Sequence, residues 1–258
     1  MQTLTRKDEM QMLNKVPEVM LFFWIIKIMC TTVGETAADF LNADLNFGLT
    51  GTSLIMGFFL AIFLVMQLRS KKYIPWLYWI VVVMVSIVGT LITDNLVDNF
   101  GIALETTTIV FSLALWATFW LWHAKEKTLS VHSIVTRQRE LFYWAAILFT
   151  FALGTAAGDW VAEGLSLGYA NSTLMFAGMI AIVTITYYRF RANAILAFWI
   201  AYILTRPLGA SFGDYLSQPV GNGGLGLGPA YTNAAFLSAI LALVIYLTVS
   251  RRDAKASA

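Results

Sequence analysis

One short pattern recurs four times along this chain. Each copy has a Trp, a Gly ten positions later and an Asp five positions after that, with no insertion inside it. The four copies are Trp24, Gly34 and Asp39; Trp79, Gly89 and Asp94; Trp144, Gly154 and Asp159; and Trp199, Gly209 and Asp214. Tandem duplication explains such regularity, so we expect the chain to fold as four similar units.

The composition places these units in a membrane. Charged residues make up only 12% of the 258 positions and hydrophobic residues 59%, whereas a typical soluble domain carries about 25% charged residues. Apolar runs of about twenty residues can cross a bilayer core as helices. We predict two such helices per unit, at residues 17–41, 49–68, 75–96, 103–122, 142–161, 169–188, 195–216 and 230–249.

The expected fold is therefore an all-α integral membrane protein with eight transmembrane helices. Two spans per unit make all four repeats point the same way, as parallel rather than inverted repeats. The predicted segments are a tail (1–15), repeat 1 (16–73), repeat 2 with a central link (74–136), repeat 3 (137–193), repeat 4 (194–250) and a second tail (251–258).

The positions of Lys and Arg predict the orientation. Of the seventeen, all but Lys27 and Arg206 lie in the two tails or in the 2–3, 4–5 and 6–7 links, and the other four loops have none. By the positive-inside rule both termini are cytoplasmic. Basic links could also bind nucleic acid or anionic lipid, but their placement at every second loop favours orientation. The predicted partners are the lipid bilayer and a small substrate, with no nucleic acid.

Polar residues form a column on one face of each odd-numbered span. Steps of four residues, ending at the repeat Asp, keep to one side of a helix. The columns are Lys27, Thr31, Glu35 and Asp39; Val82, Ser86, Thr90 and Asp94; Ile147, Phe151, Thr155 and Asp159; and Tyr202, Arg206, Ala210 and Asp214. Polar side chains facing lipid are costly, so we expect these columns in the interior of the bundle.

The four Asp of the repeat then lie at one depth, towards the outer leaflet. We predict that Asp39, Asp94, Asp159 and Asp214 line a cation path together with Glu35 and could ligate a metal ion. The alternative is that each Asp only caps its helix at the membrane surface, and duplication would copy a cap too. Glu35 lies a turn deeper, where capping does not explain it.

Lys27 and Arg206 have no counterparts in the other repeats, and we predict that they are internal counter-ions. The alternative is that they extend to the membrane surface. An unpaired Arg in hydrocarbon is costly, so Arg206 should pair with Asp214 two turns on, or with Glu35 if the repeats close into a ring. The Arg206-Pro207 pair with Gly209 also predicts a kinked or broken helix.

The repeated Trp and Gly residues have structural interpretations. Trp24, Trp79, Trp144 and Trp199 could anchor the helices at the membrane interface or pack between helices. Gly34, Gly89, Gly154 and Gly209 should allow helices to approach closely, although a bend near the Asp is an alternative.

Several chemistries are not expected. His123 and His132 lie in the central link and Cys30 is the one cysteine, so a buried His or Cys metal site is not predicted. A metal held by carboxylates would be a hard ion such as manganese, magnesium or calcium. The Gly-Asp pairs at Asp159 and Asp214 resemble those of intramembrane aspartyl proteases, but four equivalent Asp do not make a catalytic pair. We therefore predict that the chain is not an enzyme.

The repeat also resembles a known family. The segments 31–41 (TTVGETAADFL), 187–191 (YYRFR), 204–216 (LTRPLGASFGDYL) and 223–228 (GGLGLG) are similar to those of bacterial membrane proteins defined by a repeat of unknown function. In that family each repeat has two transmembrane segments and a characteristic Trp. The resemblance implies a multi-pass protein of the bacterial inner membrane and supplies no activity.

The residues themselves favour a transporter. We predict movement of a cation, a hard divalent metal such as manganese, as substrate through a carboxylate-lined path, with no other cofactor. The alternatives are a proton-coupled exporter of a small organic substrate and a membrane scaffold or sensor that transports nothing.

Overall fold

The computed structural model describes residues 14–254, and every regular element among them is a helix. Eight are long and apolar enough to cross a membrane, as predicted. They are α2 (Leu21–Asp39), α3 (Gly48–Arg69), α4 (Pro75–Asp94), α5 (Leu104–Glu126), α6 (Arg137–Asp159), α7 (Tyr169–Phe190), α8 (Ala194–Ser217) and α9 (Pro229–Ser250). The chain is therefore a multi-pass membrane protein. Most of the predicted tails, residues 1–13 and 255–258, lie outside the described residues.

Local sequence explains several helix ends. Pro75 and Pro229 are the first residues of α4 and α9, where proline has no hydrogen bond to lose and its φ already suits a helix. The side chain of Asn193 accepts hydrogen bonds from the N–H groups of Ile195 and Leu196 and so caps α8. These signals are independent of the rest of the fold.

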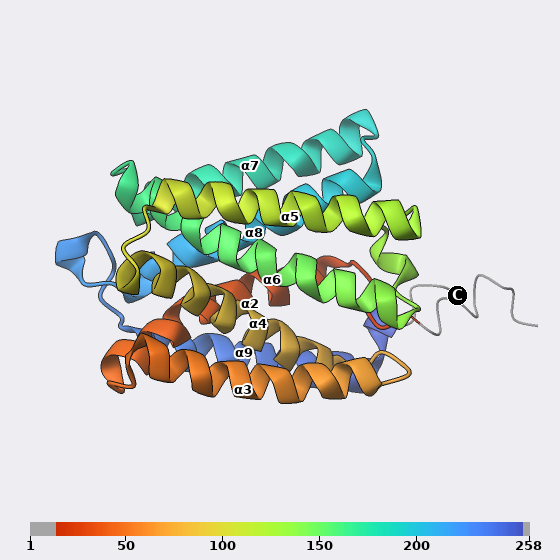
Figure 1. Cartoon of the computed structure of the whole chain (residues 1–258), viewed down its shortest axis with the longest axis horizontal. Helices are drawn as coiled ribbons and strands as arrows, with labels where there is room; N and C mark the ends of the chain where they lie inside the picture. The colour runs from red at the N-terminus through yellow and green to blue at the C-terminus, as the bar shows by residue number, and fades with distance from the viewer. Residues whose placement is uncertain (1–13, 255–258) are drawn as a thin grey trace, which may run out of the picture.

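The long helices run alongside one another in a bundle (Figure 1), and their contacts divide them into an inner ring and an outer layer. The first helix of each repeat belongs to an inner ring, in which α2 packs on α4, α4 on α6, α6 on α8 and α8 on α2. The second helix of each repeat lies outside and packs on the inner helix of the next repeat: α3 on α4, α5 on α6, α7 on α8 and α9 on α2. The four repeats thus close into a ring, with the first and last as neighbours.

Burial separates the two layers. Half to two thirds of each inner span is buried (50–67%), against 11–28% of each outer span. Large apolar side chains such as Leu54, Ile182 and Leu241 point out of the bundle from α3, α7 and α9. In a membrane this outer layer faces lipid, so the inner ring is the place for polar side chains.

The two ends of the bundle differ in charge. The acidic end holds the four repeat Asp, and the basic end holds the links at 70–74, 127–136 and 191–193. The described parts of both termini meet at the basic end, where the Glu18 N–H donates to the Asp253 carbonyl oxygen at 3.1 Å. Corresponding residues of the inner helices lie at the same level, so the repeats are parallel, as predicted.

Of the kink or break predicted at Pro207, the break is not found, because α8 runs without interruption from Ala194 to Ser217 with Pro207 inside it. Irregularity occurs instead after the other three Asp, where the α-helix passes into π-helical turns. These are Phe40–Asp44, Asn95–Asn99 and Trp160–Gly164. Such turns are rare and often found at functional sites.

Candidate functional site

Eight aromatic side chains pack in a closed cycle, the aromatic cycle, in the basic half of the inner ring. In each repeat the residue before the Trp contacts the Trp of the next repeat, and the cycle closes from α8 back to α2. The centroid distances are 5.7 Å for Phe23–Trp79, 5.6 Å for Tyr78–Trp144, 6.3 Å for Tyr143–Trp199 and 5.6 Å for Phe198–Trp24. Trp79, Trp144 and Trp199 are buried, which favours packing between helices over anchoring at the interface.

The four repeat glycines let the inner helices approach one another. A Cβ added to each would collide with the residue seven positions after the Trp of the next repeat. The pairs are Gly34 with Ser86, Gly89 with Phe151, Gly154 with Arg206 and Gly209 with Thr31. Close approach is therefore confirmed, and it draws the polar columns together at the axis of the ring.

The predicted columns face the interior. All their members below the Asp level are buried: Lys27, Thr31, Glu35, Val82, Ser86, Thr90, Ile147, Phe151, Thr155, Tyr202, Arg206 and Ala210. One more step of four towards the basic end reaches Phe23, Tyr78, Tyr143 and Phe198 of the aromatic cycle. These four residues lie beyond the predicted columns, and the same spacing of four identifies them.

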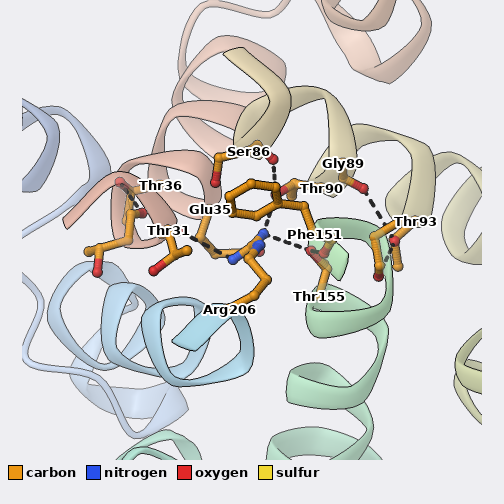
Figure 2. A network of polar contacts seen from close by, with 12 residues as sticks. Thr31, Glu35, Thr36, Ser86, Gly89, Thr90, Thr93, Phe151, Thr155 and Arg206 are labelled. Carbon is orange, nitrogen blue, oxygen red and sulfur yellow. Dashed lines mark hydrogen bonds and ion pairs between the residues drawn. The ribbon is translucent and has the colours of Figure 1, made fainter. Parts of the chain in front are cut away.

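Arg206 joins all four inner helices (Figure 2). Its Nη2 donates to Glu35 Oε2 on α2 at 2.7 Å, to Thr155 Oγ1 on α6 at 2.6 Å and to Thr90 Oγ1 on α4. Its Nη1 donates to the Thr31 carbonyl oxygen at 3.2 Å. The predicted Arg206–Glu35 pair across the first and last repeats is confirmed. Arg206 does not extend to the membrane surface, because it is completely buried.

Above Arg206 lies an acidic cavity of about 170 Å³. All four repeat Asp and Glu35 line it, together with Asp98 and Glu163, and its lining residues include no Lys or Arg. Carboxylate oxygens of Glu35, Asp159 and Asp214 lie within 4.8 Å of one another, close enough to hold one metal ion. The predicted convergence of the four Asp is thus confirmed.

The capping alternative finds little support. Asp39, Asp94 and Asp159 each precede a π-helical turn, and none makes a side-chain capping hydrogen bond to it. Asp214 is buried inside α8. Three of the four Asp thus end their α-helices, but all four carboxylates line the one shared cavity.

A second, larger cavity of about 650 Å³ adjoins the first. It lies between the turn after α2 and the glycine-rich loop before α9, and shares Asp39 and Gln218 with the acidic cavity. The Gln218 amide donates to Asp39 Oδ2 at 3.5 Å. Ser217, buried in its wall, has a hydroxyl with no hydrogen-bond partner among the described residues.

A polar network that the sequence did not reveal closes the basic end. Lys15 Nζ pairs with the buried Glu140 at 2.5 Å, and Gln67 Nε2 donates to the same carboxylate at 3.3 Å. The Tyr73 hydroxyl donates to Asp253 Oδ2 at 2.6 Å. Burial raises the pKa of both Tyr73 and Asp253. These residues tie the chain termini to the helices and carry no repeat signal.

Comparisons with known proteins agree with the internal symmetry. The repeat described as Repeat of Unknown Function (DUF347) matches at residues 22–73, 77–128, 142–193 and 197–253, so that each match covers one pair of long helices. No curated protein and no solved structure shows a significant match to this chain. The chain belongs to the family defined by this repeat of unknown function, with four tandem copies that close into a ring.

Proposed function

We propose that this protein moves a small cation across the membrane along the axis of its inner ring. The observation that carries the proposal is the acidic cavity, where carboxylates from all four inner helices face one another. Ionisable groups within transmembrane helices usually mark ion pathways. Closely spaced carboxylate oxygens suit hard divalent ions, so a metal such as manganese is the favoured substrate.

Arg206 supplies a gate for such an ion. Its guanidinium bonds to Glu35, which lines the cavity and is one of the three carboxylates near enough to share a metal. A divalent ion bound there would compete with Arg206 for Glu35. Losing this partner would weaken the set of hydrogen bonds by which Arg206 joins the four inner helices, and so would couple ion binding to opening of the axis.

The proposed direction of access follows from the charges at the two ends. The positive-inside rule places the basic end in the cytoplasm and the acidic end outside. The carboxylates would then raise the local concentration of cations at the outer mouth. In a Cys30→Ala protein, single cysteines at Leu45 and Asn222 should react with an impermeant thiol reagent added to intact cells. A cysteine at Lys71 should not, and the opposite result would reject this orientation.

Metal binding to the purified protein tests the function. Asp159→Asn with Asp214→Asn removes two of the three clustered carboxylates, and we expect Mn²⁺ affinity by calorimetry to fall at least about tenfold, a loss of about 1.4 kcal/mol. Uptake of radioactive Mn²⁺ into proteoliposomes should fall in parallel. Glu105→Gln is the control, because Glu105 is exposed at the start of α5 and does not line the cavity. Unchanged Mn²⁺ binding in the double variant would refute the metal site.

The larger cavity favours a second candidate, a proton-coupled exporter of a small organic substrate. A volume of about 650 Å³ is within the range of small-molecule sites, and its neighbour Asp39 could carry the proton. This candidate predicts proton movement in proteoliposomes that depends on an organic compound and is unaffected by Mn²⁺. A protein that shows neither activity would be a scaffold or sensor.

A further inference from the structure

Lys27 lies in an aromatic cage that the acidic cavity does not explain. Its side chain is completely buried, with Nζ 4.0 Å from the centroid of the Tyr202 ring and 4.4 Å from that of Phe151. Among the described residues Nζ has no hydrogen-bond partner. A buried ammonium is usually paired with a carboxylate, and here the faces of two aromatic rings take that place.

The cage lies on the axis of the ring. Lys27 projects from α2, Tyr202 belongs to the neighbouring α8, and Phe151 belongs to α6 on the opposite side of the inner ring. Along α2, Lys27 is two turns from Glu35 towards the basic end, and Phe23 of the aromatic cycle is one turn further. An ion passing from the acidic cavity towards the basic end would therefore meet the Lys27 ammonium after Arg206.

The cage is particular to one repeat. The residues equivalent to Lys27 are Val82, Ile147 and Tyr202, so the other three repeats carry two aliphatic side chains and one aromatic ring in place of the Lys. The Phe151 ring also lies 5.9 Å from the Arg206 guanidinium carbon. A site formed by aromatic ring faces suits a singly charged organic cation better than a divalent metal.

We infer that the Lys27 cage is a second cation site, built for a primary alkylammonium group and filled in this structure by the chain's own Lys27. The side chain acts as a tethered ion that closes the axis below Arg206. Only the role in closing a path rests on the proposed function, since the cage itself is defined by its own contacts. It would accept a free alkylammonium ion once the tethered one is removed.

Chemical rescue tests this inference. Lys27→Ala removes three methylene groups and the ammonium, which together correspond to n-propylammonium, and the neutral amine can cross a membrane to reach the site. We expect Lys27→Ala to lower the midpoint of thermal unfolding in detergent and n-propylammonium chloride to raise it again by a few degrees. Equal concentrations of 1-propanol should not do so, because it fills similar space without the charge.

Two variants serve as controls. Lys27→Met fills the cage without a charge, so neither it nor the unaltered protein should respond to the amine. Adding Phe151→Leu to Lys27→Ala removes one ring face and should abolish most of the rescue. If Lys27→Ala does not accumulate in membranes, accumulation during growth with n-propylamine becomes the readout, with 1-propanol again as the control.

An equal response to amine and alcohol, or none to the amine, would overturn the cage as a cation site. The assay contains no Mn²⁺, so its outcome is separate from that of the metal-binding experiment. Successful rescue together with unchanged Mn²⁺ binding in the Asp159 and Asp214 double variant would reject the metal site and leave the cage intact.

Discussion

The two halves of the inner ring are built from the same four helices and the same repeat, yet they are filled differently. In the acidic half, four equivalent Asp surround a cavity of about 170 Å³. In the basic half, four equivalent aromatic residues pack in a cycle against the four Trp. Like charges repel and keep space between them, whereas aromatic rings attract one another and fill space.

The residues between these halves break the fourfold pattern. Glu35, Arg206 and Lys27 each occur in one repeat only, and all three are buried at the axis. Four identical acids above four aromatic residues would make a fourfold-symmetric cavity, open at the acidic end and closed at the basic end. The unrepeated charges join the two halves, so they are where control of the axis is to be expected.

The largest effect should come from breaking this junction. Arg206→Ala removes the four hydrogen bonds by which Arg206 joins the inner helices and leaves the Glu35 carboxylate buried without its partner. The loss of a buried partner typically costs about 3–5 kcal/mol. We expect a large fall in the free energy of unfolding, measured by denaturant titration in detergent, or loss of the protein from the membrane.

Neutralising the partner provides the control. Arg206→Ala with Glu35→Gln leaves no isolated charge and should recover part of the lost free energy of unfolding, which a double-mutant cycle would quantify. If Arg206→Ala alone is stable, or if Glu35→Gln gives no recovery, the pair does not hold the two halves together.

A smaller effect is expected from separating the helices where they approach closely. The Cβ of Ala in place of Gly89 would lie 2.6 Å from the Phe151 Cβ and 3.2 Å from the Ala152 nitrogen. Such overpacking costs about 1–3 kcal/mol. Thermal unfolding should show the loss, and Mn²⁺ binding should weaken with it if the spacing of α4 and α6 sets the acidic half.

Glycines of the outer helices are matched controls. Gly57 in α3 and Gly178 in α7 have no atom within 4 Å of an added Cβ. Substituting either with Ala should leave stability unchanged or raise it by up to about 1 kcal/mol, because Ala favours helices. Equal destabilisation at Gly89, Gly57 and Gly178 would contradict the close-approach role of the repeat glycine.

An effect no larger than that at Gly89 should arise within the basic half. Tyr78 and Tyr143 share a hydrogen bond of 2.6 Å between their hydroxyl groups, and both are completely buried. Tyr143→Phe leaves the Tyr78 hydroxyl without this bond, at a cost of about 1–3 kcal/mol. The aromatic packing remains, so thermal stability should fall while Mn²⁺ binding in the acidic half is unchanged.

Changing both residues sharpens this test. Tyr78→Phe with Tyr143→Phe removes both hydroxyls, and stability should be closer to that of the unaltered protein than in the single variant. Tyr188→Phe, at an exposed position on α7, should have no measurable effect. A change in Mn²⁺ affinity on altering Tyr143 would show that the two halves are coupled beyond the Arg206 contacts.

Much of this arrangement was determined by local sequence. Hydrophobic runs identified the eight spans, and steps of four residues identified the interior face of each inner helix, because the rise and turn of a helix are the same wherever it lies. The four repeat Asp could be placed at one depth for the same reason. Even the Arg206–Glu35 pair was predictable as one of two choices, because a buried guanidinium requires an acid.

Other features depended on how the helices meet. Closure of the ring selected Glu35 rather than Asp214 as the partner of Arg206, and turned the Trp residues from possible surface anchors into links between neighbouring repeats. It also brought Phe151, on the far side of the ring, to Lys27. The Lys15–Glu140 pair joins segments 125 positions apart and has no copy in the other repeats. Helical periodicity specifies which side of a helix a residue occupies, whereas its partners depend on distances between helices, which only packing of the whole chain sets.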